Sequence, residues 1–306
     1  MESNVQIGKL LIAIQGPTAS GKTKLSIDLA KHFKTVVVSA DSRQFYREMS
    51  IGTAKPDALE QDGIQHYFIN SHAVEDELTA AQYAVQASEV LEKEFKIHDT
   101  IILVGGSGMF VDALLNGLDD IPTDLALRNQ LKLEAENNGV EDLLKELFEK
   151  DPEFAKYIDK SNPSRIIRAV EAIRLTGKTH AEFRSGTTKN QPFEIVRFII
   201  DVPRELLYDR INQRVDLMIE NGLLDEAKAL LPQRNLSSLK TVGYKELFDY
   251  FDGTITLDKA IELIKQHSRN YAKRQITWLK RYQDAKIVTF RSDMSSIVIQ
   301  ELSKYS

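Results

Sequence analysis

Short apolar runs alternate with amphipathic stretches along the first third of this 306-residue chain. Residues 9–15 (KLLIAIQ) form an apolar run that ends in a glycine-containing turn, and residues 21–33 follow with apolar positions at helical spacing. A β-branched run covers 35–39, and another apolar run covers 100–104, just before the sequence GGSG at 105–108. Strands alternating with helices predict an α/β fold in which a doubly wound parallel sheet is flanked by helices.

Weaker signals complete the predicted core. Residues 67–70 can form a short strand, and Thr79 is the expected N-cap of a helix extending to about Phe95. Strand character returns at 193–202. The C-terminal part is expected to contain helices at 204–221, 223–231, 243–251 and 257–282, and a last strand at 286–290.

The texture of the chain changes between residues 118 and 190, where charged helical patterns dominate and no β-rich run occurs. One helix is well marked, with Asn162 as N-cap, Pro163 at the first helical position and Gly177 just past its end. We therefore predict an all-helical insertion domain at 118–190, inside an α/β core formed by 1–117 and 191–306.

The amino-acid composition indicates in which cellular compartment the protein works. Hydrophobic residues make up 42% and charged residues 28%, which is ordinary for a globular protein, and no apolar run reaches membrane-spanning length. Cysteine is absent, which fits a reducing compartment and excludes thiolate metal sites, and residues 1–9 lack the order of a signal peptide. We expect a cytoplasmic protein with no membrane partner.

The sequence GPTASGKT at 16–23 matches the phosphate-loop pattern G-x-x-x-x-G-K-[ST] in full. It also lies between a predicted strand and a predicted helix, where that pattern acts. Backbone N–H groups and the helix N-terminus would hold a phosphate, Lys22 would add a positive charge, and the Thr23 hydroxyl would meet Mg²⁺. The residues predicted to bind the phosphates are Gly16, Pro17, Thr18, Ala19, Ser20, Gly21, Lys22 and Thr23.

A second polar segment, SADSRQ at 39–44, follows the second predicted strand. Asp41 should lie at the carboxyl edge of the sheet, where ligands of open α/β sheets bind. From spacing alone, Asp41 can be a magnesium ligand, a helix N-cap or a general base. The loop GTAKP at 52–56 is expected nearby.

Positive charge is concentrated near the C-terminus although the net charge is −5. The segment 265–286 carries seven lysines and arginines against one acid, and Lys265, Arg269 and Lys273 recur every four residues. This stripe predicts a track for RNA phosphates, and a solvated helix face explains the charge equally well. Trp278 is interpreted as a core residue rather than a base-stacking platform.

The segments GPTASGKT, SADSRQFY, IGTAKP, VGGSGMF and AKRQITWLKR occur in this order between about Leu11 and Arg281. In motif and order the chain resembles the bacterial tRNA dimethylallyltransferases. The resemblance implies transfer of a dimethylallyl group from dimethylallyl diphosphate to N6 of adenine 37 in the tRNA anticodon loop, with release of diphosphate. It further implies that residues 16–23 hold the prenyl diphosphate together with Mg²⁺.

The resemblance also assigns roles to individual residues. Asp41, Lys22 and Thr23 would be catalytic, with Asp41 as the general base and Thr23 as the metal contact. Arg210 and Arg214 would reach the diphosphate, although surface ion pairs with Asp209 or Asp216 are an alternative. The residues implied to contact the tRNA anticodon stem-loop are Asp41, Ser42, Arg43, Gln44, Ser107, Arg128, Ser164, Arg165, Arg168, Lys240, Thr241, Val242, Gly243, Tyr244 and Lys245.

The chain departs from the family pattern at three positions. Ser107 stands where the family has a threonine, Phe110 where a tyrosine is usual, and Ser164 where a glutamine is usual. A monomer is expected. Two other classes of protein compete with this interpretation: a P-loop small-molecule or nucleoside kinase, and a non-catalytic RNA-binding module that retains a phosphate loop.

Overall fold

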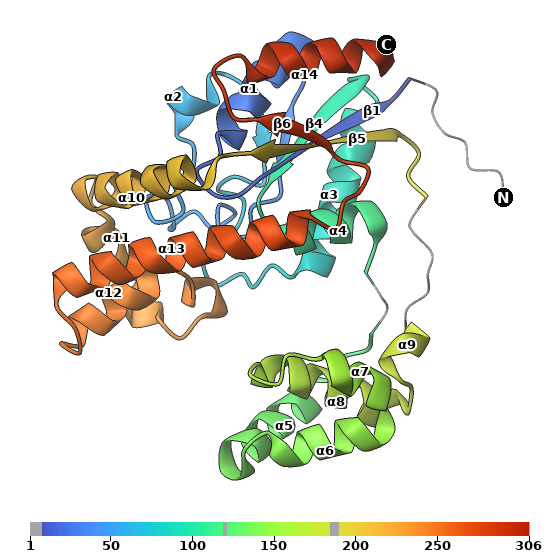
Figure 1. Cartoon of the computed structure of the whole chain (residues 1–306), viewed down its shortest axis with the longest axis vertical. Coiled ribbons are helices and arrows are strands. Elements are labelled where there is room, and N and C mark those ends of the chain that lie inside the picture. Colours follow the sequence, from blue (N-terminus) through green and yellow to red (C-terminus); the bar gives the residue numbers. More distant parts are fainter. Residues whose placement is uncertain (1–7, 119–120, 184–189, 306) are drawn as a thin grey trace. The chain divides into compact units, whose positions relative to one another are not determined.

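The protein is described from a computed structural model that covers residues 8–118, 121–183 and 190–305 (Figure 1). Residues 1–7, where no signal peptide was expected, and 184–189, within the predicted insertion, lie outside the described residues. The chain divides into two compact units. We call residues 1–116 with 190–306 the core unit, and residues 117–189 the helical unit.

Among the described residues, one six-stranded sheet forms the centre of the core unit, with the order β3-β2-β4-β1-β5-β6 and every pairing parallel. Its strands are β1 (Leu10–Gln15), β2 (Val37–Ser39), β3 (His66–Tyr67), β4 (Thr100–Gly105), β5 (Glu194–Asp201) and β6 (Lys286–Thr289). The predicted α/β fold with a parallel sheet is confirmed. All six carboxyl ends lie at one edge, which therefore brings residues 16–23, Asp41 and residues 105–108 close together.

Strand β1 is buried on both faces because helices cover the sheet on either side (Figure 1). Leu11 and Ala13 belong to the apolar core shared with α3 (Ala80–Glu94) and α4 (Gly108–Asn116). Ile12 and Ile14 belong to the opposite core, shared with α1 (Lys22–Phe33), α10 (Arg204–Glu220) and α14 (Met294–Leu302). A continuous apolar strand is what a parallel sheet covered on both faces requires.

A third apolar core of the core unit lies among its C-terminal helices. It is built mainly by α10, α11 (Leu223–Leu230), α12 (Tyr244–Phe251) and α13 (Leu257–Leu279). Shorter elements are α2 (Ala58–Gln61) and the 3-10 turns Leu231–Gln233, Ser237–Leu239 and Ser303–Tyr305.

Helices α2 and α4 were not predicted, and two further details differ from the sequence-based prediction. The predicted strand at 67–70 is reduced to β3 at His66–Tyr67, because Phe68 (φ 62°) and Asn70 (φ 54°) adopt left-handed backbone conformations that end the extended segment. Helix α14 was not predicted, since its sequence MSSIVIQEL is rich in serine and β-branched residues.

The helical unit contains α5 (Leu125–Asn138), α6 (Glu141–Lys150), α7 (Pro152–Tyr157), α8 (Pro163–Thr176) and α9 (His180–Phe183), and no strand among its described residues. The predicted limits of α8 are confirmed. The Asn162 side chain accepts a hydrogen bond from the Arg165 N–H at 3.2 Å, and Gly177 ends the helix with φ 71°. Apolar side chains of α5, α6, α7 and α8 form a separate core.

Inside the helical unit, the fully buried carboxylate of Glu171 joins α8 to α5. It accepts hydrogen bonds from Arg128 (2.9 and 3.1 Å) and from the backbone N–H of Asp124 (2.8 Å), and Arg168 lies 3.5 Å away. Removing one member of a buried pair leaves its partners without their acceptor.

We therefore expect Glu171→Ala to destabilise the helical unit by about 3 kcal/mol. Hydrogen exchange of the amides of α5 and α8 in the full-length protein measures this loss, because exchange reports local opening. Glu153→Ala is the matched control, since the Glu153–Lys156 pair is exposed and should contribute below about 1 kcal/mol. Equal exchange in the two variants would contradict the structural role of Glu171.

Candidate active site

The phosphate loop, residues 16–23, connects β1 directly to α1. Gly21 precedes the helix with φ 86°, a conformation that favours glycine. A side chain at position 16 would also meet Ser20, because a Cβ there would lie 2.7 Å from the Ser20 Oγ. The loop thus brings the N-terminus of α1 to the carboxyl edge of the sheet, as anion binding requires.

A cavity of about 1470 Å³ opens at this edge of the core unit. Its walls come from segments far apart in the sequence: the phosphate loop, residues 41–44, residues 50–57, α10, residues 240–246 and α13. Most of the residues predicted to bind the diphosphate and several of those predicted to bind tRNA therefore line one common space.

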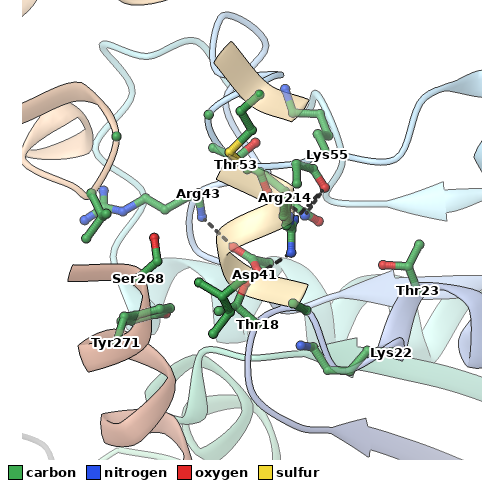
Figure 2. A pocket seen from close by; sticks show the side chains of 18 of the residues that line it. Thr18, Lys22, Thr23, Asp41, Arg43, Thr53, Lys55, Arg214, Ser268 and Tyr271 are labelled. Atoms are coloured by element: carbon green, nitrogen blue, oxygen red, sulfur yellow. Dashed lines mark hydrogen bonds between the residues drawn. The ribbon is translucent and has the colours of Figure 1, made fainter. Parts of the chain in front are cut away.

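Asp41 lies in this cavity just after β2, with Lys22, Arg214 and Tyr271 around it (Figure 2). Its Oδ1 accepts a hydrogen bond from the backbone N–H of Arg43 at 3.1 Å, so the side chain closes a turn. No helix begins at Asp41, and the N-cap alternative is therefore wrong. Burial and then the nearby Asp41 carboxylate raise the pKa of Tyr271.

Lys22 begins α1 and bends back over the phosphate loop, where its Nζ donates to the Pro17 carbonyl at 2.7 Å. Loss of surrounding water lowers the pKa of Lys22 to about 8; Asp41 offsets part of this effect and Arg214 adds to it. An anionic ligand in the loop would favour the charged form of this lysine.

Arg210 and Arg214 both point from α10 to the phosphate loop. Arg210 donates to the Ala19 carbonyl at 2.8 Å, and Arg214 donates to the Thr18 Oγ1 at 3.1 Å. The alternative of surface ion pairs with Asp209 or Asp216 is wrong, because both arginines are directed to the phosphate loop and Asp216 pairs with Lys265 at 2.5 Å. Burial lowers the pKa of Arg214, and Asp41 partly opposes this shift.

Two residues that the sequence analysis did not single out support the phosphate loop. Gln275 of α13 accepts a hydrogen bond from the Thr18 N–H at 2.8 Å and donates to the Gly106 carbonyl at 2.9 Å. Phe290, just after β6, stacks under the Arg210 guanidinium at 4.6 Å. The available signal for Gln275 was its place in the segment AKRQITWLKR, whereas nothing in the sequence distinguished Phe290.

The residues around Asp41 that were predicted to contact tRNA make hydrogen bonds within the protein. The Ser107 Oγ lies 3.0 Å from the Ser42 Oγ, and Gln44 donates to two carbonyls of residues 53 and 54 at 3.2 Å each. Arg43 donates to the Ser238 carbonyl at 2.9 Å. These bonds hold the segment 42–44 in place beside the cavity.

Residues 240–245 contribute to the same cavity, with one exception. Lys240, Thr241, Val242, Gly243 and Lys245 line it. The Tyr244 side chain is instead fully buried, and its hydroxyl donates to Glu226 at 2.6 Å. The Tyr244 side chain therefore does not line the cavity, and contact of this residue with tRNA stays a prediction.

The other residues predicted to contact tRNA lie in the helical unit. Arg128 and Arg168 both neighbour the buried Glu171, which gives each of them a structural role that the sequence did not reveal. Ser164 and Arg165 are exposed in the first turn of α8. Contact of these four residues with tRNA stays a prediction.

The basic stripe of α13 is used largely for helix packing. Lys265 pairs with Asp216 of α10, and Arg269 donates to Asn212 of the same helix at 2.6 Å. Lys273 remains exposed. Trp278 is half-buried, and a Cβ at position 108 would lie 2.1 Å from its ring, so Gly108 allows this close packing.

No helix in the described part of the chain is long and apolar enough to cross a membrane. Nor do the described residues contain a cluster of three or more histidine and carboxylate side chains that could hold a metal ion.

A phosphate loop at the carboxyl ends of a parallel sheet, with two arginines directed to it and a carboxylate lining the same cavity, is the arrangement of a P-loop protein. Comparison with known proteins narrows this class. Residues 44–282 match the family described as IPP transferase, and the chain belongs to that family.

Relatives and solved structures agree with this assignment. The chain is 47% identical to tRNA dimethylallyltransferase 1 of Phocaeicola vulgatus, covering 95% of this chain and 96% of that protein. It is 44% identical to the tRNA dimethylallyltransferase of Cytophaga hutchinsonii, covering 92% of each. The crystal structure of the full-length tRNA isopentenylpyrophosphate transferase from Bacillus halodurans is 37% identical, with a TM-score of 0.72 and coverage of 97% and 98%. The resemblance seen in the sequence motifs is thus confirmed.

A further structure is that of a eukaryotic dimethylallyltransferase acting on tRNA. It superimposes with a TM-score of 0.83 at 26% identity and covers 97% of this chain and 79% of that one.

Proposed function

We propose that the chain is a tRNA dimethylallyltransferase, which transfers the dimethylallyl group of dimethylallyl diphosphate to N6 of adenosine 37 in the anticodon loop and releases diphosphate. The observation that carries this proposal is the Asp41 carboxylate, placed in the same cavity as the phosphate loop. Family membership supports the reaction, and the cavity offers room for a donor and an acceptor base together.

The acceptor is activated by removal of a proton. The exocyclic amine of adenine is a poor nucleophile because its lone pair is delocalised into the ring. Asp41, acting as general base, takes a proton from N6 as the new C–N bond forms. The half-buried carboxylate is kept in position by its bond to the Arg43 N–H. The target base has to leave its stack, which an anticodon loop permits more readily than a duplex.

The donor is activated by stabilising its leaving group. As the bond between the allylic carbon and oxygen breaks, negative charge grows on the diphosphate while the allylic carbon carries positive charge. Lys22, Arg210 and Arg214 surround the phosphate loop and offset that negative charge. Backbone N–H groups of residues 18–23 add further donors at the helix N-terminus.

Mg²⁺ fits this site as a ligand brought with the diphosphate. Thr23, which lines the cavity in the first turn of α1, offers a hydroxyl. The cation would therefore keep mainly phosphate and water oxygens, the mode that Mg²⁺ prefers with phosphorylated substrates. When bound, it would supply further neutralisation of the leaving diphosphate.

A P-loop kinase is the competing function, and one assay separates the two. The purified protein is incubated with labelled dimethylallyl diphosphate and tRNA lacking the modification, and in parallel with ATP and nucleosides. We expect label in the nuclease digest as N6-dimethylallyladenosine. Phosphoryl transfer to a nucleoside, without prenyl incorporation, would overturn the proposal in favour of a kinase.

The low pKa of Lys22 predicts a pH dependence. The anionic donor binds the ammonium form of Lys22, and in the donor-free protein that form is lost as the pH rises through about 8. We expect kcat/KM for the donor to fall above about pH 8 and to be maintained just below it.

The variant Lys22→Arg tests whether Lys22 causes this fall in kcat/KM, because a guanidinium stays protonated at these pH values. The decrease of kcat/KM near pH 8 should disappear in this variant, although its activity at all pH values is lower. Burial also lowers the pKa of Lys55 to about 8. If kcat/KM of Lys22→Arg still decreased near pH 8, the decrease would therefore come from deprotonation of another group such as Lys55.

We further propose that the cavity-lining residues of the segment 240–245 contact the tRNA anticodon stem-loop. Separately, we propose that the exposed start of α8 contacts tRNA, that the protein acts as a monomer, and that it works in the cytoplasm. The exposed Ser164 and Arg165 and the cavity-lining Lys240 and Lys245 support the tRNA contact.

A further inference from the structure

The carboxylate of Glu226 lies outside the family motifs and accepts hydrogen bonds from a loop that lines the cavity. Glu226 lies in the first turn of α11. One of its oxygens accepts from the N–H groups of Ser50 (2.9 Å) and Ile51 (2.8 Å). The other accepts from the Gly52 N–H (2.9 Å) and from the Tyr244 hydroxyl (2.6 Å). We call residues 50–54 the bridging loop.

Three consecutive N–H groups that converge on one point form a nest for an anion. Here the protein's own carboxylate occupies that nest, and the local packing leaves it little freedom. A Cβ at Gly52 would lie 2.7 Å from the Tyr244 ring, so glycine is needed for the ring to approach and for its hydroxyl to reach Glu226. The bridging loop is therefore fixed from one side by α11 and α12.

The other side of the bridging loop presents two adjacent carbonyls to the cavity. The Thr53 and Ala54 oxygens accept from Gln44 at 3.2 Å each and from Arg214 at 3.4 and 3.3 Å. Each carbonyl has two lone pairs and can serve both donors. Gln44 belongs to the segment that the family resemblance predicts to contact tRNA, and Arg214 to the group proposed to hold the donor. Gln44 and Arg214 are thus held by the same two carbonyl oxygens.

We propose that Glu226 is a positioning residue for both substrates: by fixing the bridging loop, it holds Gln44 on the acceptor side and Arg214 on the donor side. This role rests on the proposed function and adds to it a residue that touches neither substrate. It is a link through hydrogen bonds in which Glu226 acts on Arg214 through the Thr53 and Ala54 carbonyls.

The variant Glu226→Gln tests this link, because it keeps the shape of the side chain and replaces one acceptor oxygen with an N–H₂ donor. That donor would face N–H or O–H groups, so the loop should shift. Small displacements of positioning groups lower rates by up to about 100-fold. We expect kcat/KM for the donor to fall at least about 10-fold and the Kd for tRNA to rise.

Asp225→Asn is the matched control. It removes the same charge from the neighbouring position of the same helix turn, where the side chain is exposed. Its kinetic constants should stay near those of the wild-type protein. Tyr244→Phe leaves the three backbone bonds to Glu226 intact and should have a smaller effect than Glu226→Gln. Thermal unfolding of all three variants reports any general loss of folding.

A double-mutant cycle distinguishes positioning from a general structural role. If Glu226 acts through Arg214, Glu226→Gln should have little further effect on the donor kcat/KM in an Arg214→Ala background. An effect of equal size in both backgrounds, or a Glu226→Gln variant that behaves like Asp225→Asn, would overturn the proposal. Should Glu226→Gln fold poorly, Glu226→Asp, which keeps the charge but shortens the reach, is put through the same cycle.

Binding of inorganic diphosphate, measured by calorimetry, keeps this test separate from the proposed function. Weaker diphosphate binding by Glu226→Gln than by Asp225→Asn supports the role of Glu226 even if the wild-type protein transfers no prenyl group. Prenyl transfer by the wild-type protein, together with equal diphosphate binding by both variants, would leave the proposed function intact and reject the positioning role.

Discussion

Replacing Asp41 with asparagine is expected to lower kcat for prenyl transfer by about 10²- to 10⁴-fold, the range typical for loss of a general base. The amide keeps an oxygen that can accept the hydrogen bond from the Arg43 N–H, so the turn should persist. What is lost is the group that takes the N6 proton. Single-turnover measurements with saturating donor and tRNA report this step directly.

Measurement of tRNA binding shows whether Asp41→Asn has lost only the general base or also the structure of the site. The Kd of Asp41→Asn for tRNA is expected to stay close to the wild-type value, because the side chains of residues 42–44 and 240–245 are unchanged. Asp99→Asn is a suitable control, since Asp99 is exposed and precedes β4 at the opposite edge of the sheet. Turnover of Asp41→Asn at the wild-type rate would remove Asp41 from the chemistry.

The sequence was sufficient for those parts of the fold that depend on local pattern. The apolar strand before residues 16–23 and the caps at Asn162 and Gly177 are set by neighbouring residues, and the structure confirms them. Helix α14 escaped prediction because its serines and β-branched residues disfavour a helix locally. Packing of Met294, Val298 and Leu302 into the core beside α1 outweighs that preference.

In the candidate site, too, residues set by local sequence were predicted and residues set by distant contacts were not. Lys22 and Asp41 were found because they follow strand ends, and chain topology brings strand ends together. Gln275 and Glu226 were missed because their partners, Thr18 and residues 50–52, lie far away in sequence. Burial of the Tyr244 side chain was not predicted, because a short motif gives no information on which of its side chains turns into the core.

The second large effect is expected at Lys22. In the variant Lys22→Ala, the leaving diphosphate loses a charged donor in a site where burial has already removed much of the solvent. Loss of one such electrostatic contact lowers rates by about 10²- to 10³-fold. We expect kcat to fall and KM for the donor to rise, because Lys22 would contact the diphosphate both before and during bond breaking.

The neighbouring lysine of the same helix provides the comparison. Lys24 is exposed and lies 3.3 Å from Asp28, and its pairing at the surface should contribute little. Lys24→Ala is therefore expected to retain nearly full kcat/KM for the donor, while Lys22→Ala loses most of it. Both variants should bind tRNA alike, since Lys22 points into the phosphate loop and not to the proposed tRNA-binding rim. If Lys24→Ala were impaired as strongly as Lys22→Ala, the loss would reflect the overall positive charge of α1, and Lys22 would have no specific place beneath the diphosphate.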